Sequence, residues 1–199
     1  MQDRPEMQGA IPTSHDVVSW LVDGFNGDRL GQRVFWNANS PQSGRAAEHA
    51  PPYGTYPPYI ALSGGTETTA VDKWASVVYE MFNVENSDQF SAISESAING
   101  SLDADGFADK CMELEFSALI KTRDFFQKHP LPKSKHGRDV WYNWVTSEVG
   151  TYQSYKEKFD VPGANSLNSN FSYFKEYYKS TIVPYADAMR HSKRTSGAP

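Results

Sequence analysis

The sequence predicts an α+β fold, a predominantly helical single domain with a small sheet built from its first half. Two short runs rich in β-branched and aromatic residues, Gln32–Asn37 and Tyr59–Ser63, are typical of strands. Residues 70–128 instead carry apolar side chains at three- and four-residue steps, the period of helices that bury one face. The last third, residues 138–189, is rich in aromatic residues and is also predicted to be helical.

The first third of the chain is predicted to be the least regular. Residues 1–13 are polar and contain two prolines, so we expect a flexible N-terminal segment. A short helix is expected from Val17 to about Gly24. The stretch 39–58 holds several prolines, which exclude a helix, and is predicted to be a long irregular loop. His49 lies in this loop and is a candidate binding residue, because the loop could fold over the helix that follows.

Three helices are predicted in the middle of the chain, at about 70–84, 89–98 and 104–128. Their cap candidates are the threonines that end at Thr69, the run that starts at Asn86, and Asp103. The first and third of these helices are expected to pack against each other and form the core.

The last third is expected to form helices near 138–148 and 150–159, followed by a helical stretch at 167–189. Pro184 is predicted to interrupt or kink that last stretch. The single domain is therefore predicted to cover residues 14–189, and residues 190–199 are predicted to be a flexible tail.

Composition excludes several classes of protein. The net charge is −5 and no run of Lys or Arg stands out, which argues against nucleic-acid binding. No stretch reaches the length of about 18 apolar residues that a membrane span requires. The N-terminus lacks the apolar region of an intact signal peptide. We therefore expect a soluble protein of unknown compartment, and export with a removed signal stays an alternative.

A single cysteine and scattered histidines limit the possible metal and thiol chemistry. Cys111 is the only cysteine, so no intrachain disulfide and no Cys-rich zinc site can form. Its neighbours are typical of a helix interior, which predicts a buried, inert thiol. No two histidines share the i, i+4 spacing that a zinc helix uses.

Glu80 stands at the centre of the most informative pattern, Tyr79-Glu80-Met81-Phe82-Asn83. These five residues resemble the His-Glu-x-x-His helix of the zincin-like metallopeptidases, which binds zinc through two imidazoles one turn apart. The resemblance extends over about residues 32–128 through the order strand, loop, strand, helix and later helix. It implies that Glu80 occupies the general-base position and that Tyr79 and Asn83 occupy the two histidine positions.

The same resemblance suggests further site residues. In the glutamate-type branch of these peptidases the third ligand is a glutamate on a later helix, and Glu113 or Glu115 stands in a similar place. Because the zinc-binding histidines are absent, the resemblance implies a degenerate, non-catalytic scaffold without zinc. If Glu80 is buried, it must find hydrogen-bond partners, and Tyr79, Asn83 and Glu113 are the candidates.

Two other patterns are candidates for binding sites. Asp103 and Asp105 match part of an EF-hand loop, but the bidentate glutamate at its twelfth position is missing, so we expect helix capping and no calcium. The aromatic residues of the last third, with Trp141 and Trp144 as the main candidates, could line a groove that binds a carbohydrate or peptide. The alternative is that these rings pack a core or an oligomer face.

Three functional hypotheses follow. The preferred one is a non-catalytic, zincin-like domain that acts in binding or structure, with an unknown protein, peptide or carbohydrate as its partner. The second is a hydrolase that uses Glu80 with Glu113 or Glu115. The third is a carbohydrate- or peptide-binding module that uses the aromatic last third.

Overall fold

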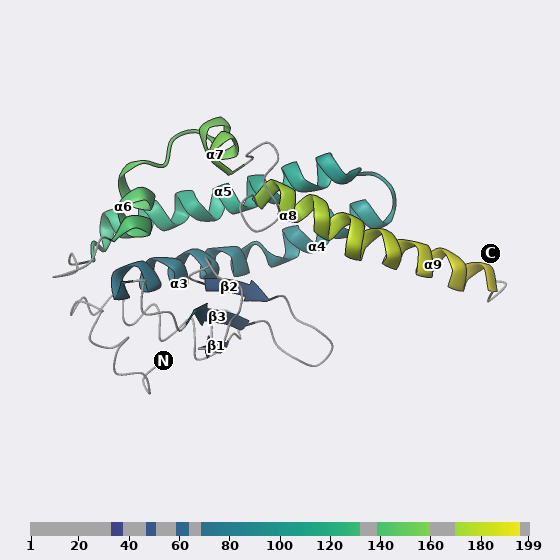
Figure 1. The fold of residues 1–199 in the computed structure, drawn as a ribbon, viewed down its shortest axis with the longest axis horizontal. Helices are drawn as coiled ribbons and strands as arrows, with labels where there is room; N and C mark the ends of the chain where they lie inside the picture. Colours follow the sequence, from purple (N-terminus) through teal and green to yellow (C-terminus); the bar gives the residue numbers. More distant parts are fainter. Residues whose placement is uncertain are drawn as a thin grey trace. The chain divides into compact units, whose positions relative to one another are not determined.

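The computed structural model describes residues 33–37, 47–50, 59–63, 69–131, 139–159 and 170–195. The helix expected at 17–24 lies outside these residues. The elements, in chain order and labelled as in Figure 1, are β1 (Arg33–Asn37), β2 (Ala47–Ala50), β3 (Tyr59–Ser63), α3 (Ala70–Glu85), α4 (Ser87–Ile98), α5 (Ala104–Lys128), α6 (Val140–Ser147), α7 (Tyr152–Phe159), α8 (Asn170–Tyr177), the π-helical turn η1 (Tyr178–Ile182) and α9 (Val183–Thr195).

The chain divides into two compact units, which are described separately. Unit 1 comprises Met1–Ser87 and Ser117–Val149, and unit 2 comprises Asp88–Phe116 and Gly150–Pro199. Helix α5 therefore contributes its first part to unit 2 and its second part to unit 1. The single domain expected over 14–189 stays a prediction.

The predicted α+β fold class is wrong. Over residues 69–131, 139–159 and 170–195 the chain is 86% helical and contains no strand, so this part has an all-helical fold. The physical reason is that the strand-like runs of the first half are short, whereas the helical periodicity covers almost all of the remaining described residues. Among the residues whose burial is described, the buried apolar side chains lie almost entirely on helices.

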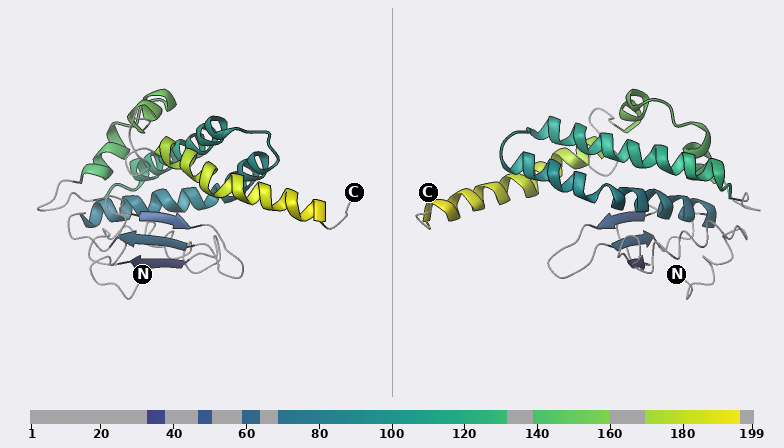
Figure 2. Two further views of the ribbon diagram at one scale, coloured as in Figure 1. Left: turned by 45° about the vertical axis from the view of Figure 1, so that its right-hand side comes forward. Right: turned by 180° about the vertical axis from the view of Figure 1, so that it is seen from behind.

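The described residues of the first half of the chain contain three short strands, which belong to unit 1. β1 and β3 coincide with the two expected runs, and β2 falls inside the predicted loop at 39–58. Their order is β1-β3-β2, with β1 parallel and β2 antiparallel to β3 (Figure 2). His49 is thus a strand residue in register with Ile60, not a loop residue.

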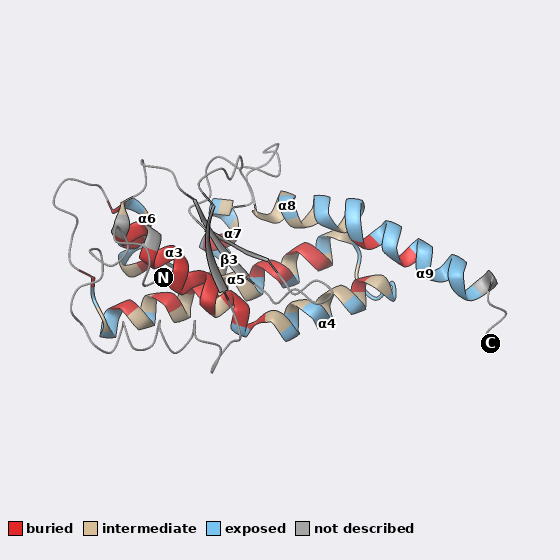
Figure 3. Cartoon of the chain, turned by 90° about the horizontal axis from the view of Figure 1, so that it is seen from below, coloured by how far each residue is buried: buried red, intermediate tan, exposed pale blue. Residues whose placement is uncertain are grey.

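Helix α3 is buried on nearly all sides. Its apolar period predicts burial of one face only. Thr69 is its N-cap and accepts a hydrogen bond from the Asp72 backbone N–H, as the sequence predicts. α3 contacts β2, β3 and α6. Its buried side chains include both apolar and polar residues (Figure 3), namely Val71, Asp72, Trp74, Ala75, Ser76, Val77, Val78, Tyr79, Glu80, Met81, Asn83 and Val84. A helix buried all round must satisfy its polar side chains inside the protein.

The connection from α4 to α5 follows the predicted capping chemistry. Gly100 has a φ of +80°, the left-handed conformation that glycine adopts without strain. The Gly100 and Ser101 N–H groups bond the carbonyls of Ala97 and Ser96, which ends α4 in a Schellman-type cap. Asp103 then accepts a hydrogen bond from the Gly106 N–H at 2.8 Å and starts α5.

Unit 2 has its own apolar core. Its fully buried members come from α4, α5 and the C-terminal helix, namely Ala97, Phe107, Cys111 and Ile182. Partly buried apolar residues pack around them, including Phe90 and Ile93 of α4 and Phe174 of α8. The core of this unit therefore joins segments from both halves of the described chain.

The C-terminal helix differs from the prediction in two ways. The expected helical stretch ends at Met189, whereas α9 continues to Thr195. The expected interruption at Pro184 takes the form of the π-helical turn η1, in which the Val183 N–H bonds the Tyr178 carbonyl. A proline ring clashes with the carbonyl four residues earlier in an α-helix, here Ser180, and a wider turn relieves that clash.

Candidate functional site

Glu80 lies in unit 1, on the buried surface of α3. Its side chain is 8% exposed, and its Oε2 accepts a hydrogen bond from the Asn83 Nδ2 at 3.2 Å. Asn83 is 3% exposed. The structure therefore brings together two of the residues that the resemblance singles out, and it joins them in a buried hydrogen bond one helical turn apart.

Tyr79 and the two tryptophans also belong to packed surroundings in unit 1. Tyr79 is buried, and its ring meets the edge of Trp141 with the ring centroids 5.6 Å apart. Trp141 in turn packs against Trp144, which is 9% exposed. These rings join α3 to α6, and the alternative that they form a core matches their position.

The two candidate acidic partners lie in unit 2. Glu113 is exposed, and its carboxylate binds the Lys110 ammonium at 2.8 Å on the same helix. Glu115 is half-buried two residues further on. Glu113 thus forms an ordinary i, i+3 ion pair, which in this exposed position contributes little to stability.

The remaining predicted site residues have local roles. Asp103 caps α5, as expected, and Asp105 binds the Lys175 ammonium of α8 at 2.5 Å. His49 is placed only by its backbone, in β2. Among the described residues no group of three or more His, Cys, Asp and Glu side chains is arranged to hold a metal ion.

A buried polar junction between α3 and α6 is the main feature that the sequence analysis missed. The Asp72 carboxylate accepts a hydrogen bond from the Tyr142 backbone N–H at 2.8 Å, at the start of α6. The N-cap residue of α6, Asp139, makes no cap bond to its own helix and instead accepts one from the Thr69 hydroxyl at 2.9 Å. The start of α6 is therefore capped by a side chain of α3, a tertiary form of capping, whereas α3 keeps its own N-cap, Thr69, whose hydroxyl donates to Asp139.

Burial dominates the electrostatics of this junction. The pKa of Asp72 is raised above 3.8, chiefly because burial disfavours its charged form. Hydrogen bonds from the backbone N–H groups of Tyr142, Trp141 and Val140 act in the opposite direction, and the nearby charge of Asp139 raises the pKa further. The Tyr142 hydroxyl oxygen accepts a hydrogen bond from the buried Leu131 N–H at 2.9 Å, which ties the end of α5 to the same junction.

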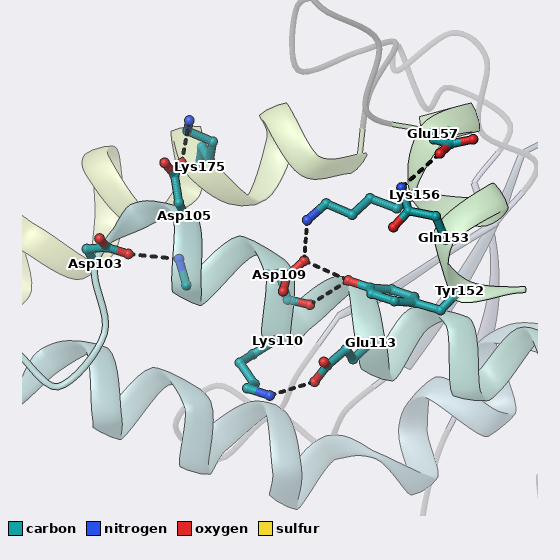
Figure 4. A network of polar contacts seen from close by, with 11 residues as sticks. Asp103, Asp105, Asp109, Lys110, Glu113, Tyr152, Gln153, Lys156, Glu157 and Lys175 are labelled. Carbon is teal, nitrogen blue, oxygen red and sulfur yellow. Dashed lines mark hydrogen bonds and ion pairs between the residues drawn. The ribbon is translucent and has the colours of Figure 1, made fainter.

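Unit 2 contains a second polar network, shown in Figure 4. Asp109 of α5 accepts hydrogen bonds from the Lys156 ammonium at 2.6 Å and from the Tyr152 hydroxyl at 2.8 Å, both on α7. Lys156 and Lys175 both lie over the ring of Phe171, at 5.1 and 5.5 Å from its centroid. Together with the Lys175–Asp105 pair, these contacts join α5, α7 and the start of α8.

Ion pairing dominates the electrostatics of this second network. The hydrogen bond from Lys156 lowers the pKa of Asp109 below 3.8, and the bond from Tyr152 adds to this effect. Burial, followed by the bond to Asp109, raises the pKa of Tyr152. Tyr152 and Lys156 stand at i, i+4 spacing, which was the only sequence signal that their side chains share a face.

Cys111 matches the inert thiol that the sequence predicts. Its side chain is 2% exposed within the core of unit 2, and burial raises its pKa. A thiol that is both buried and hard to ionise is a poor nucleophile.

No family model, curated protein or solved structure matches this chain. In the part of the chain that the structure describes, no helix combines the length and apolar character that crossing a membrane requires.

Proposed function

We propose that this chain is a non-catalytic binding or structural protein, in which Glu80 stabilises a buried helix and does not perform chemistry. The observation that carries the proposal is the burial of Glu80 together with its hydrogen bond to Asn83. A general base must reach a substrate or a bound water within hydrogen-bond distance. The buried Glu80 carboxylate instead accepts a hydrogen bond from Asn83 of the same helix, α3.

The surroundings of Glu80 support the same proposal. Tyr79 and Asn83, at the positions of the two imidazoles in the peptidase motif, are both buried, and Tyr79 packs against Trp141. The resemblance of residues 79–83 to a metallopeptidase helix stays a prediction, and the proposal does not depend on it. The competing hydrolase needs an open cleft in which Glu80 meets a second acid, whereas Glu113 is engaged by Lys110.

The test compares Glu80→Gln with Glu85→Gln, a change on the same helix at an exposed glutamate whose side chain is 31% exposed. We expect Glu80→Gln to lower the unfolding free energy by about 1 kcal/mol, because it weakens a charge-assisted hydrogen bond in a buried site. The control should change stability far less, because surface ion pairs contribute little. Both are measured by urea denaturation followed by circular dichroism.

The same proteins should be assayed for hydrolysis of casein and for bound metal by mass spectrometry. The proposal expects no hydrolysis that depends on Glu80 and no zinc bound in proportion to protein. Hydrolysis or stoichiometric zinc in the native protein that is lost in Glu80→Gln, while Glu85→Gln retains it, would overturn the proposal and favour the hydrolase.

A further inference from the structure

The turn that joins α4 to α5 places an asparagine directly before a glycine. The sequence holds two such pairs, Asn26-Gly27 and Asn99-Gly100, and the second lies within the described residues. Asn99, Gly100 and the following Ser101 are all exposed. An exposed Asn-Gly pair is chemically reactive, because the side-chain amide carbon of the asparagine can reach the backbone nitrogen of the glycine.

Gly100 leaves the approach to its nitrogen open. A Cβ built on Gly100 would meet no atom within 4 Å, so the space around this residue is unoccupied by its neighbours. Any other residue type at this position would place a side chain beside the nitrogen. The Asn99 side chain is exposed, so it is free to turn toward that nitrogen.

Hydrogen bonds at the end of α4 restrain the pair in the folded protein. The Gly100 N–H donates to the Ala97 carbonyl at 3.0 Å, and the Ser101 N–H donates to the Ser96 carbonyl at 2.9 Å. Bonds in the last turn of a helix open at a far lower free-energy cost than the whole fold does. The Gly100 nitrogen is therefore released in brief local openings of this turn, without unfolding of unit 2.

We propose that Asn99 is a deamidation site, at which the folded protein slowly converts a side-chain amide to a carboxylate in water. The Gly100 nitrogen loses its proton to hydroxide and attacks the Asn99 Cγ. The new N–Cγ bond closes a succinimide ring, the Cγ–Nδ2 bond breaks, and Nδ2 takes a proton from water and leaves as ammonia. Water then opens the ring at either carbonyl, which leaves aspartate or isoaspartate in place of Asn99.

The new carboxylate stands in an unfavourable position. The C-terminal end of a helix carries a partial negative charge, and α4 has no basic residue in its last turn. Glu95 stands four residues before Asn99, the spacing at which like charges on a helix destabilise it. Asp103 adds a further acidic group four residues after Asn99. Deamidation therefore weakens the end of α4 through charge alone.

The isoaspartate product also changes the backbone. The chain then runs through the Cβ and Cγ atoms of position 99, so the two N–H groups that cap α4 no longer meet their carbonyls. Leu102, which follows in the same turn, packs against the core of unit 2. Its carbonyl accepts a hydrogen bond from the Tyr178 hydroxyl at 3.1 Å. A displacement of this turn therefore reaches the core of unit 2.

The reaction cannot reverse in water, so unit 2 loses stability as the protein ages. Asn99 belongs to unit 2, whereas Glu80 belongs to unit 1. The deamidation of Asn99 and the role proposed for Glu80 can therefore fail separately.

Peptide mapping of the aged full chain by mass spectrometry tests the site. The protein is kept at body temperature and mildly alkaline pH, where hydroxide speeds the reaction. The internal control is Asn143, an exposed asparagine of α6 that precedes Trp144. Asn99 should convert at least about tenfold faster than Asn143, because Gly100 leaves its nitrogen open whereas the Trp144 side chain obstructs the attack. Conversion at Asn99 that is no faster than at Asn143 contradicts the proposal.

The variant Asn99→Gln tests the structural consequence. Glutamine keeps the amide but must close a larger ring, so it deamidates far more slowly. Hydrogen exchange of each aged protein is compared with that of its own fresh sample. Ageing should speed exchange at the end of α4 and the start of α5 in the native chain and leave Asn99→Gln unchanged. An equal change in both proteins, or no change in native protein whose Asn99 has converted, would overturn the proposal.

Discussion

The polar networks of the two units stabilise helix contacts by opposite physical means. In unit 1, Asp72 is 6% exposed and bonds to the backbone at the start of α6, and burial raises its pKa. In unit 2, the Asp109 side chain is 38% exposed and bonds to Lys156, which lowers its pKa. The pKa values of these two aspartates are therefore shifted in opposite directions, although nothing in the sequence distinguishes the two residues. The contribution of a carboxylate to stability therefore depends on its hydrogen-bond partner and on its exposure, not on the residue type.

The largest effect is expected at the buried junction. Asp72→Ala removes the acceptor for the start of α6 and should lower the unfolding free energy by about 2 to 3 kcal/mol, because buried N–H groups lose their partner. Asp72→Asn keeps an acceptor of the same shape and should cost clearly less. Urea denaturation measures both, with Asp124→Ala, an exposed residue of α5, as the control. If Asp72→Ala and Asp124→Ala lowered the unfolding free energy equally, the cap that Asp72 provides for α6 would contribute nothing to stability.

A smaller effect is expected from the hydroxyl that joins α5 to the same junction. Tyr142→Phe keeps the ring, which packs against Phe126, but leaves the buried Leu131 N–H without its partner. We expect a loss of about 1 to 2 kcal/mol in unfolding free energy. Tyr185→Phe, which removes the hydroxyl of a ring that is 54% exposed, is the control. A stability equal to that of the native protein would mean that this N–H is satisfied in another way.

The smallest effect is expected in the partly exposed network around Asp109 in unit 2. Lys156→Met removes the ammonium that binds Asp109 and keeps most of the apolar stem, so we expect a loss of only about 0.5 kcal/mol at neutral pH. Raising the salt concentration should reduce this difference further, because exposed charges are screened. Thermal unfolding at low and high salt measures it, and a loss as large as that of Asp72→Ala would contradict the comparison.

The two networks should change the unfolding free energy in opposite directions as the pH falls. The folded pKa of Asp109 is below 3.8, so its contribution to stability is present above 3.8 and is lost as the pH falls through the folded value. The folded pKa of Asp72 is above 3.8, so its contribution is largest below 3.8 and is lost as the pH rises through the folded value. Asp109→Asn should therefore flatten the acid loss of stability, whereas Asp72→Asn should steepen it. Urea denaturation between pH 2 and pH 6 distinguishes these outcomes, and the same slope change in both variants would refute the contrast.

The sequence predicted the helices better than the fold class. Helix α5 begins and ends where its apolar period and Asp103 indicate, and Gly100 ends α4 as glycine commonly does. These features depend on residues close together in the chain, so local physics is sufficient to predict them. The predicted α+β fold class was wrong because residues 69–131, 139–159 and 170–195 contain helices and no strand.

The candidate site could be predicted only in part. Glu80 and Asn83 are one helical turn apart, so their contact follows from spacing alone. The depth of their burial does not follow from spacing, because it depends on the strands and helices that cover α3. The junction of Thr69, Asp72, Asp139 and Tyr142 was missed because its partners are about seventy residues apart in the chain, and a single sequence carries no signal for such a pairing.

The sequence by itself determined where most helices of this protein begin and end, and that its one cysteine cannot form an intrachain disulfide. Only the tertiary structure decided which of the polar and aromatic residues are enclosed and which are left exposed. The physical reason is that helix boundaries depend on neighbours within a few residues, whereas burial and pKa depend on groups brought together by folding. Aspartate therefore forms a buried helix cap at Asp72 and a partly exposed ion pair at Asp109.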